Sequence, residues 1–215
     1  MSDTTNLNQS LRAAARAGHA ETLAGLLAAG ADVHARGDQA LRGAAAHGHT
    51  ETVRALLAAE ADVHASEDEA LRAAARNGHA DVVALLLDAG ADVHTWDDYP
   101  LRWAGNLGHA DVVALLLDAG ADVHARNDDA LRDAAYQGHL EVVRVLLGPN
   151  NVYDGGMDPR GYRFFGLRLD DGITVAAGCG WLTLDAAREH WADNPDALAR
   201  VERIAEWASS PGEKQ

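Results

Sequence analysis

The sequence predicts a mainly α-helical protein, an α-solenoid of five helix pairs followed by a small α+β module. The first 148 residues repeat every 30 residues, and each repeat holds two short stretches with helical apolar spacing. After Gly148 the rhythm stops and residues typical of strands and turns follow. We therefore expect a repeat domain over residues 1–148 and a capping module of the ββαα type over residues 149–215.

Three short motifs mark the repeat. A Leu-Arg pair occurs at Leu11-Arg12, Leu41-Arg42, Leu71-Arg72, Leu101-Arg102 and Leu131-Arg132. A Gly-His pair follows it, with glycines at Gly18, Gly48, Gly78, Gly108 and Gly138. The segment Ala-Asp-Val-His ends at His34, His64, His94 and His124. The step is 30 residues each time without insertion or deletion, so the repeats are expected to share one local structure.

The first helix of each repeat is expected to begin at a side chain that caps free N–H groups. In the third repeat this helix is predicted over residues 68–76, and its inner residues are Leu and small Ala. The glycine of each Gly-His pair provides the left-handed backbone that ends such a helix. The predicted capping residues are Asn8, Asp38, Asp68, Asp98 and Asp128.

The second helix of the third repeat is predicted over residues 80–89. Its apolar face is too wide for one partner, which indicates burial between two neighbouring repeats. A second glycine ends this helix at Gly30, Gly90 and Gly120, but Glu60 occupies the same position in the second repeat. Glu60 is expected either to avoid positive φ or to be strained.

The stretch AAARNGHADVVALLLDAGADVH at residues 73–94, with its copies over roughly residues 8–147, resembles the ankyrin-repeat family. The family's usual repeat has about 33 residues and begins with Thr-Pro-Leu-His, of which only Pro100-Leu101 remains here. The connector at residues 35–41 is about three residues shorter than the family's β-hairpin finger, so recognition through hairpin tips is in doubt. The resemblance implies a scaffold that binds another protein on its concave face.

The histidines are predicted to be structural. Nine of the 11 form two ladders, one after each Gly and one after each Asp-Val. Equivalent residues of stacked helices lie about 8–10 Å apart, whereas the ligands of one ion lie about 2 Å from it. Neighbours in a ladder therefore cannot share a metal, and the resemblance implies a hydrogen-bonding role for the Gly-His histidine. We expect no metal and no cofactor.

The arginines of the Leu-Arg pairs form a third ladder, each four residues after a capping position and on the same helix face. One interpretation is an electropositive strip that binds an acidic partner. The favoured one is pairing with the capping side chains, because four of those five are acidic.

The partner site is predicted from the positions that vary among the repeats. They lie in the connectors and the first helices, which the resemblance places on the concave face, and aromatic residues gather there in repeats four and five. Aromatics among polar neighbours are typical of binding hot spots; the alternative is that Trp103 or Tyr136 packs against the C-terminal segment. The predicted partner-binding residues are Trp96, Tyr99, Trp103, Asn106, Leu107, Asp133 and Tyr136.

The C-terminal module is predicted as two strands, residues 162–169 and 173–177, joined by the turn Asp170-Asp171-Gly172. A helix capped by Thr183 runs to about Trp191, and Asn194-Pro195 opens another. A module of about 60 residues has little independent stability, so we expect it to dock on the fifth repeat and cover its apolar end.

Two observations bear on activity and origin. Cys179 and His190 offer a nucleophile and a base, but no motif of a thiol enzyme surrounds them, and a lone cysteine is usually a small buried hydrophobe. Residues 177–191 resemble a C-terminal module of uncharacterised bacteriophage-encoded proteins, which implies a phage or bacterial origin.

Composition narrows the class of partner. Eighteen basic and 33 acidic residues give a net charge of -15, which argues against nucleic acid and anionic membranes. The single cysteine disfavours a secreted disulfide scaffold, and the polar first ten residues do not resemble a signal peptide. No apolar run approaches the roughly 20 residues of a membrane span. We therefore expect a cytoplasmic protein, and we expect it to be monomeric. The predicted function is a non-catalytic adaptor or inhibitor that captures another protein. The alternative is a C-terminal module that binds a small molecule or carries catalysis, with the repeats as a targeting arm.

Overall fold

The computed structural model describes residues 2–148, 151–157, 159, 163–169, 172–177 and 180–210. Contacts divide the chain into two compact units, one of residues 1–104 and 111–126, the other of residues 105–110 and 127–215. The second unit therefore contains residues 127–148 of the fifth repeat as well as the C-terminal module. The boundary expected after Gly148 stays a prediction.

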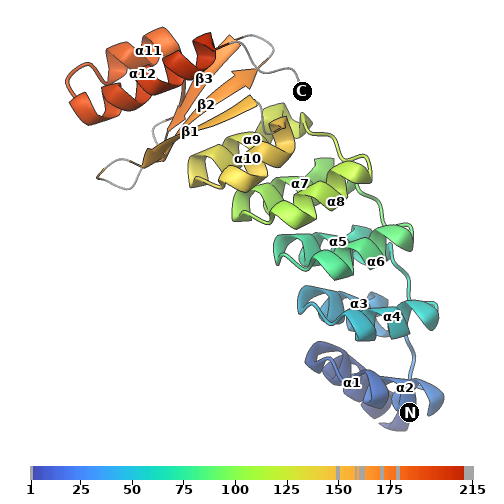
Figure 1. Ribbon diagram of the computed structural model, residues 1–215. Helices are drawn as coiled ribbons and strands as arrows, with labels where there is room; N and C mark the ends of the chain where they lie inside the picture. Colours follow the sequence, from blue (N-terminus) through green and yellow to red (C-terminus); the bar gives the residue numbers. More distant parts are fainter. Residues whose placement is uncertain are drawn as a thin grey trace. The chain divides into compact units, whose positions relative to one another are not determined.

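Each of the five repeats folds as the predicted pair of helices (Figure 1). The pairs are α1 (Ser2–Ala17) with α2 (Ala20–Ala28), α3 (Ala35–Ala46) with α4 (Thr50–Ala58), α5 (Ala65–Arg76) with α6 (Ala80–Asp88), α7 (Thr95–Leu107) with α8 (Ala110–Asp118), and α9 (Ala125–Gln137) with α10 (Leu140–Leu147). In α5, Leu71, Ala74 and Ala75 are fully buried. The second helix α4 contacts both α2 and α6, and Val83 and Leu86 of α6 are fully buried. The expected burial between neighbours is confirmed.

The Gly-His pairs join each repeat to the next. Gly48 ends the first helix with φ 74°, and a Cβ there would lie 2.6 Å from the His79 ring of the following repeat. His79 Nε2 lies 3.2 Å from the carbonyl oxygen of Ala46, a hydrogen bond that also crosses between repeats. Glycine is therefore needed at this position both for its backbone conformation and for the close approach of the imidazole.

The connectors between repeats depart from the prediction. Ser66, Glu67 and Asp68 are all left-handed, with φ of 56°, 59° and 57°, so right-handed helix begins only after them. The expected helix cap is wrong: the Asp68 carboxylate accepts the N–H of Asp92 at 2.9 Å and lies 3.1 Å from His64 Nδ1. The same carboxylate bond recurs between Asp38 and Asp62 and between Asp98 and Asp122.

The first repeat differs at its start. Its first helix begins at Ser2, not at Asn8, so Asn8 lies inside α1. The Asn8 side chain nevertheless accepts the N–H of Asp32 at 2.8 Å, as the aspartates do in later repeats. The recurring bond therefore holds the turn after the second helix against the first helix of the same repeat.

The ladder arginines close the left-handed connectors. Arg72 donates from Nε to the carbonyl oxygen of Glu67 at 3.1 Å and from Nη2 to that of Ser66 at 2.9 Å. Arg102 makes the corresponding bonds in the next repeat. For Arg72, the predicted pairing with the capping aspartate is therefore wrong, because backbone carbonyls turned outward by the left-handed connector take the guanidinium instead.

Glu60 takes the strained alternative, with φ 64° where the equivalent glycines have φ of 92–95°. A left-handed non-glycine residue costs about 1–2 kcal/mol, partly offset by the greater freedom of glycine in the unfolded chain. We expect Glu60→Gly to raise the free energy of unfolding by about 0.5–1 kcal/mol, measured by urea denaturation. Glu60→Ala removes the same carboxylate but keeps the strain, so an equal gain from alanine would refute this account.

The C-terminal module contains the two expected strands and helices, and two further strands flank them. The antiparallel sheet has the order β1 (Val152–Met157), β2 (Arg163–Leu169), β3 (Gly172–Ala177), β4 (Gly180–Thr183). β1 was missed because its Asp-Gly-Gly sequence is typical of a turn, and the structure places a register shift there. β4 has only four residues. Asp170 and Asp171 of the predicted turn lie outside the described residues.

Helices α11 (Leu184–His190) and α12 (Pro195–Ser209) begin as predicted, with Thr183 accepting the N–H of Ala186 and Asn194 that of Ala197. They cover one face of the sheet, where Phe164, Val201 and Ile204 share a buried core. The Arg188 guanidinium joins the two helices and lowers the pKa of the Glu202 carboxylate through a hydrogen bond and its charge. This link is present above the ordinary carboxylate pKa and is lost as pH falls through the lowered one.

The opposite face of the sheet is also buried. Phe165 and Leu167 alternate with Phe164 along β2 and are fully buried, although they are not part of the core under α11 and α12. Within the second unit, α10 contacts β1, and Gly138 lies against the side chain of Arg163. The module therefore contacts the fifth repeat within this unit, and its expected role as a cap of the stack stays a prediction.

Candidate functional site

Three aromatic side chains form a row along α7. Trp96, Tyr99 and Trp103 are spaced three and four residues apart, which brings them onto one side of the helix. The ring centroids of Trp96 and Tyr99 lie 5.9 Å apart at an interplanar angle of 84°, and those of Tyr99 and Trp103 lie 5.7 Å apart. The predicted gathering of these three aromatics is therefore a direct ring contact within the first unit.

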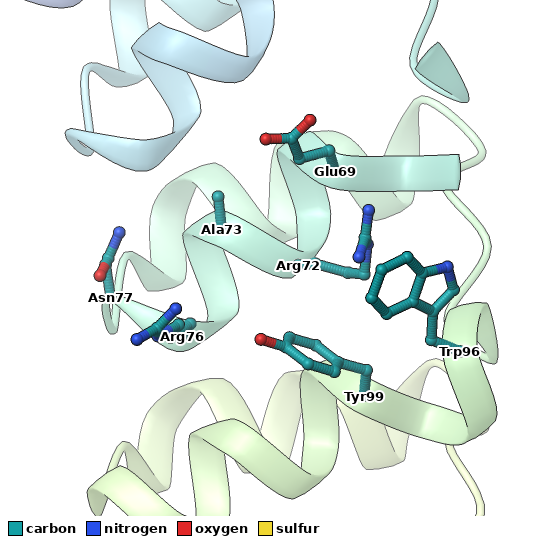
Figure 2. A pocket seen from close by; sticks show the side chains of 7 residues that line it. All are labelled: Glu69, Arg72, Ala73, Arg76, Asn77, Trp96 and Tyr99. Atoms are coloured by element: carbon teal, nitrogen blue, oxygen red, sulfur yellow. The ribbon is translucent and has the colours of Figure 1, made fainter. Parts of the chain in front are cut away.

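Two arginines of α5 lie against this row, and Figure 2 shows Arg72 beside Trp96. The Arg72 guanidinium carbon is 3.7 Å from the centroid of the Trp96 ring, and that of Arg76 is 4.8 Å from the centroid of Trp103. The Trp96 indole N–H also donates to the Glu67 carboxylate. Each cation–ring contact at an exposed site contributes about 0.5–1 kcal/mol, so the rings are held in place before any partner arrives. We call Arg72, Arg76, Trp96, Tyr99 and Trp103 the aromatic–arginine surface.

Much of this surface is open to solvent. Trp96 is 54% exposed, while Tyr99 and Trp103 are half-buried. A hollow of about 450 Å³ lies between α5 and α7, with Tyr99 and Trp96 at one side and Arg76 and Asn77 at the far end (Figure 2). It is lined by Glu69, Arg72, Ala73, Arg76, Asn77, Trp96 and Tyr99.

The other predicted residues form a second group, within the second unit. The Asn106 side chain donates to the Asp133 carboxylate at 3.1 Å and so ties the fourth repeat to the fifth. Leu107 is 41% exposed and Tyr136 61%. That exposure disfavours the alternative in which Tyr136 packs against the C-terminal segment, and Trp103 contacts Tyr99 and Arg76.

The predicted site residues include neither the lining of a second hollow nor the arginines of the two hollows, although Arg42 and Arg72 belong to the arginine ladder considered as a strip for an acidic partner. The second hollow, of about 270 Å³, adjoins the first through Glu69 and Ala73. Arg16 and Arg76 both stand two residues before a Gly-His glycine, at a position already noted as variable, so the signal was present. The second hollow is lined by Arg16, Gln39, Arg42, Gly43, Ala46, His47, Glu69 and Ala73.

Histidines of the Gly-His ladder are hydrogen-bonded to backbone carbonyl oxygens of the preceding repeat. His49 Nε2 lies 2.9 Å from the carbonyl oxygen of Arg16, and His139 Nε2 lies 3.0 Å from that of Asn106. Within the described part of the chain, no group of three His, Cys, Asp or Glu side chains is placed to hold a metal ion. Cys179 lies outside the described residues, while the His190 ring packs edge-on to Trp191 at 4.8 Å.

Comparison with known families agrees with the helix-pair architecture. A family model described as "Ankyrin repeats (3 copies)" matches residues 11–97 and 94–154, more than half of the chain. The chain belongs to the ankyrin-repeat family, and its repeats form a protein–protein interaction domain. A search among curated proteins found no similar sequence. In the helices that the structure describes, none is long and apolar enough to cross a membrane.

Proposed function

We propose that this protein is a non-catalytic adaptor or inhibitor that captures a partner protein on the face formed by the first helices of its repeats. The aromatic–arginine surface anchors the partner. The observation that carries this proposal is the exposed Trp96 ring, stacked on the Arg72 guanidinium and hydrogen-bonded to Glu67.

Three physical features support a protein as the ligand. Trp, Tyr and Arg are the residue types enriched in binding hot spots. Their side chains are held by one another in the free protein, so less conformational freedom is lost on binding. Leu107 and Tyr136 provide additional exposed apolar area on the second unit, and we assign them to the same function.

The proposal also covers the protein's cellular location, oligomeric state, origin and class of partner. We place the protein in the cytoplasm as a monomer of phage or bacterial origin, with a component of host machinery as its partner and no role for nucleic acid. The resemblance of residues 177–191 to phage-encoded modules, the single cysteine and the net charge of -15 support these assignments.

The test is affinity capture from cells of the source, read by mass spectrometry. The variant Trp96→Ala/Tyr99→Ala/Trp103→Ala is expected to lose the captured partner. Its melting temperature should fall by about 4–16 °C, because four ring–ring and cation–ring contacts of about 0.5–1 kcal/mol each are removed and two of the rings are half-buried. The matched control Glu51→Ala/Arg54→Ala removes an exposed ion pair from α4 and should retain the partner. Retention of the partner by the triple variant would refute the assignment of the site.

A further inference from the structure

We propose that the two adjoining hollows form one groove that binds an extended acidic segment of the partner, with a carboxylate at every third residue. This inference rests on the proposed function and specifies the chemistry of the partner at that face. It also gives a binding role to the cations of the first helices.

The charge of the groove is opposite to that of the chain. Four arginines line the two hollows, whereas Glu69 is the one acidic residue among the lining side chains and is paired with Arg42. The whole chain carries a net charge of -15. Because the chain is negatively charged overall, negative charges of a ligand are attracted near the four arginines and repelled elsewhere. The cleft therefore favours an anion whose charges coincide with the arginines. The lining arginines are Arg16, Arg42, Arg72 and Arg76.

The residues that line the two hollows come from four repeats. Arg16 comes from α1, Gly43 from α3, Ala73 from α5 and Tyr99 from α7. Glu69 and Ala73 of α5 line both hollows, so the two hollows adjoin along that helix. Gly43, Ala46 and Ala73 contribute small side chains to the lining, which lets a backbone approach closely.

The spacing of the repeats sets the spacing of the acids. Neighbouring packed helices lie about 8–10 Å apart. An extended polyproline-type chain rises about 3.1 Å per residue, so three residues advance it by about 9 Å. Arg42 and Arg72 occupy equivalent positions of neighbouring repeats, and Arg16 and Arg76 occupy equivalent positions two repeats apart. Carboxylates three or six residues apart in such a chain therefore match these arginine spacings, and a guanidinium can pair with a carboxylate through hydrogen bonds.

The aromatic end of the groove favours the same conformation. Trp96 and Tyr99 present ring faces and edges beside Arg72 (Figure 2). Aromatic-lined grooves bind polyproline-type segments because these are already extended and lose little freedom on binding. Proline between the acids would fix the chain in that form.

A single-stranded nucleic acid would also offer anions to arginines and bases to aromatic rings. It carries a charge at every nucleotide, however, and the whole chain has a net charge of -15. A peptide with three or four carboxylates meets less repulsion from that field. The acidic segment is therefore the better fit, and the nucleic acid becomes an arm of the test.

The test measures fluorescence anisotropy of labelled peptides with the full chain in dilute salt. The probe is four copies of Asp-Pro-Ser; its matched control has the same composition with the four aspartates adjacent, and a second control replaces Asp by Asn. We expect the spaced probe to bind, the adjacent-aspartate control to bind at least about fivefold more weakly, and the Asn peptide to show no binding. The affinity of the spaced probe should fall steadily as salt is raised.

The groove variant Arg16→Gln/Arg76→Gln should bind the spaced probe with about tenfold lower affinity, whereas Arg54→Gln on α4 should leave that affinity unchanged. Three outcomes with the unmodified chain would overturn the inference. They are no binding of the spaced probe, equally tight binding of the adjacent-aspartate or Asn peptide, and an affinity that is independent of salt. Binding of a 12-nucleotide single strand as tight as the spaced probe would overturn it in favour of phosphate. If the probes fail while the triple alanine variant still loses its captured partner, only this inference falls and the proposed function stands.

Discussion

Gly48→Ala is expected to lower the free energy of unfolding by about 2–4 kcal/mol. A left-handed alanine costs about 1–2 kcal/mol, and a methyl group forced into a packed contact adds about 1–3 kcal/mol. At Gly48, φ is 74° and the Cβ would lie 2.6 Å from His79 Nδ1. The ring cannot withdraw freely, because its Nε2 is hydrogen-bonded to Ala46 on the same preceding helix.

Two other glycines separate these contributions. Gly90 has φ 95° and nothing within 4 Å of a Cβ, so Gly90→Ala should show only the backbone cost of about 1–2 kcal/mol. Gly25 lies inside α2 with equally open space, so Gly25→Ala should be neutral or stabilising by up to about 1 kcal/mol. Urea denaturation of the three variants measures their free energies of unfolding, and the expected loss is largest for Gly48→Ala and smallest for Gly25→Ala. Equal losses at Gly48 and Gly90 would show that the His79 contact has no weight.

The second large effect is expected for Arg72→Ala, which should lower the free energy of unfolding by about 1–3 kcal/mol. It removes two hydrogen bonds to the left-handed connector and the guanidinium beneath Trp96. Three successive left-handed residues cost about 1–2 kcal/mol each, so a connector that loses its clamp should open locally.

Arg72→Lys is the informative control for this prediction. Lysine keeps the charge, but its single ammonium group lacks the planar fork that reaches two carbonyl oxygens and stacks on a ring. We therefore expect lysine to recover less than half of the lost stability, with faster hydrogen exchange at residues 66–68 in both variants. Full recovery by lysine would mean that charge alone acts at this position.

The helix pairs could be predicted because a 30-residue step, the Gly-His glycines and the apolar spacing all concern neighbours in sequence. The left-handed connectors could not, since their stability comes from the Arg72 side chain closing on the carbonyls of Ser66 and Glu67. Four acidic caps suggested a carboxylate partner for the arginines instead. In the C-terminal module, strand pairing overrode the turn-like Asp154-Gly155-Gly156 sequence of β1.

The candidate site was predicted in part. Trp96, Tyr99 and Trp103 were found by comparing the repeats with one another. Their stacking partners Arg72 and Arg76 belong to the preceding repeat, 24 to 27 residues earlier in the chain, so no local pattern joins them. The contact exists only because α5 and α7 are first helices of adjacent repeats.

The central claim is that a partner protein binds over the aromatic–arginine surface. Hydroxyl-radical footprinting of the full chain, alone and with its captured partner, tests this most directly, since Trp96 is reactive and 54% exposed. We expect strong protection of Trp96, Tyr99 and Trp103 in the complex and unchanged labelling of Leu85 and Leu115 on the second helices. Unchanged labelling of Trp96 with protection on the second helices or the C-terminal module would contradict the account.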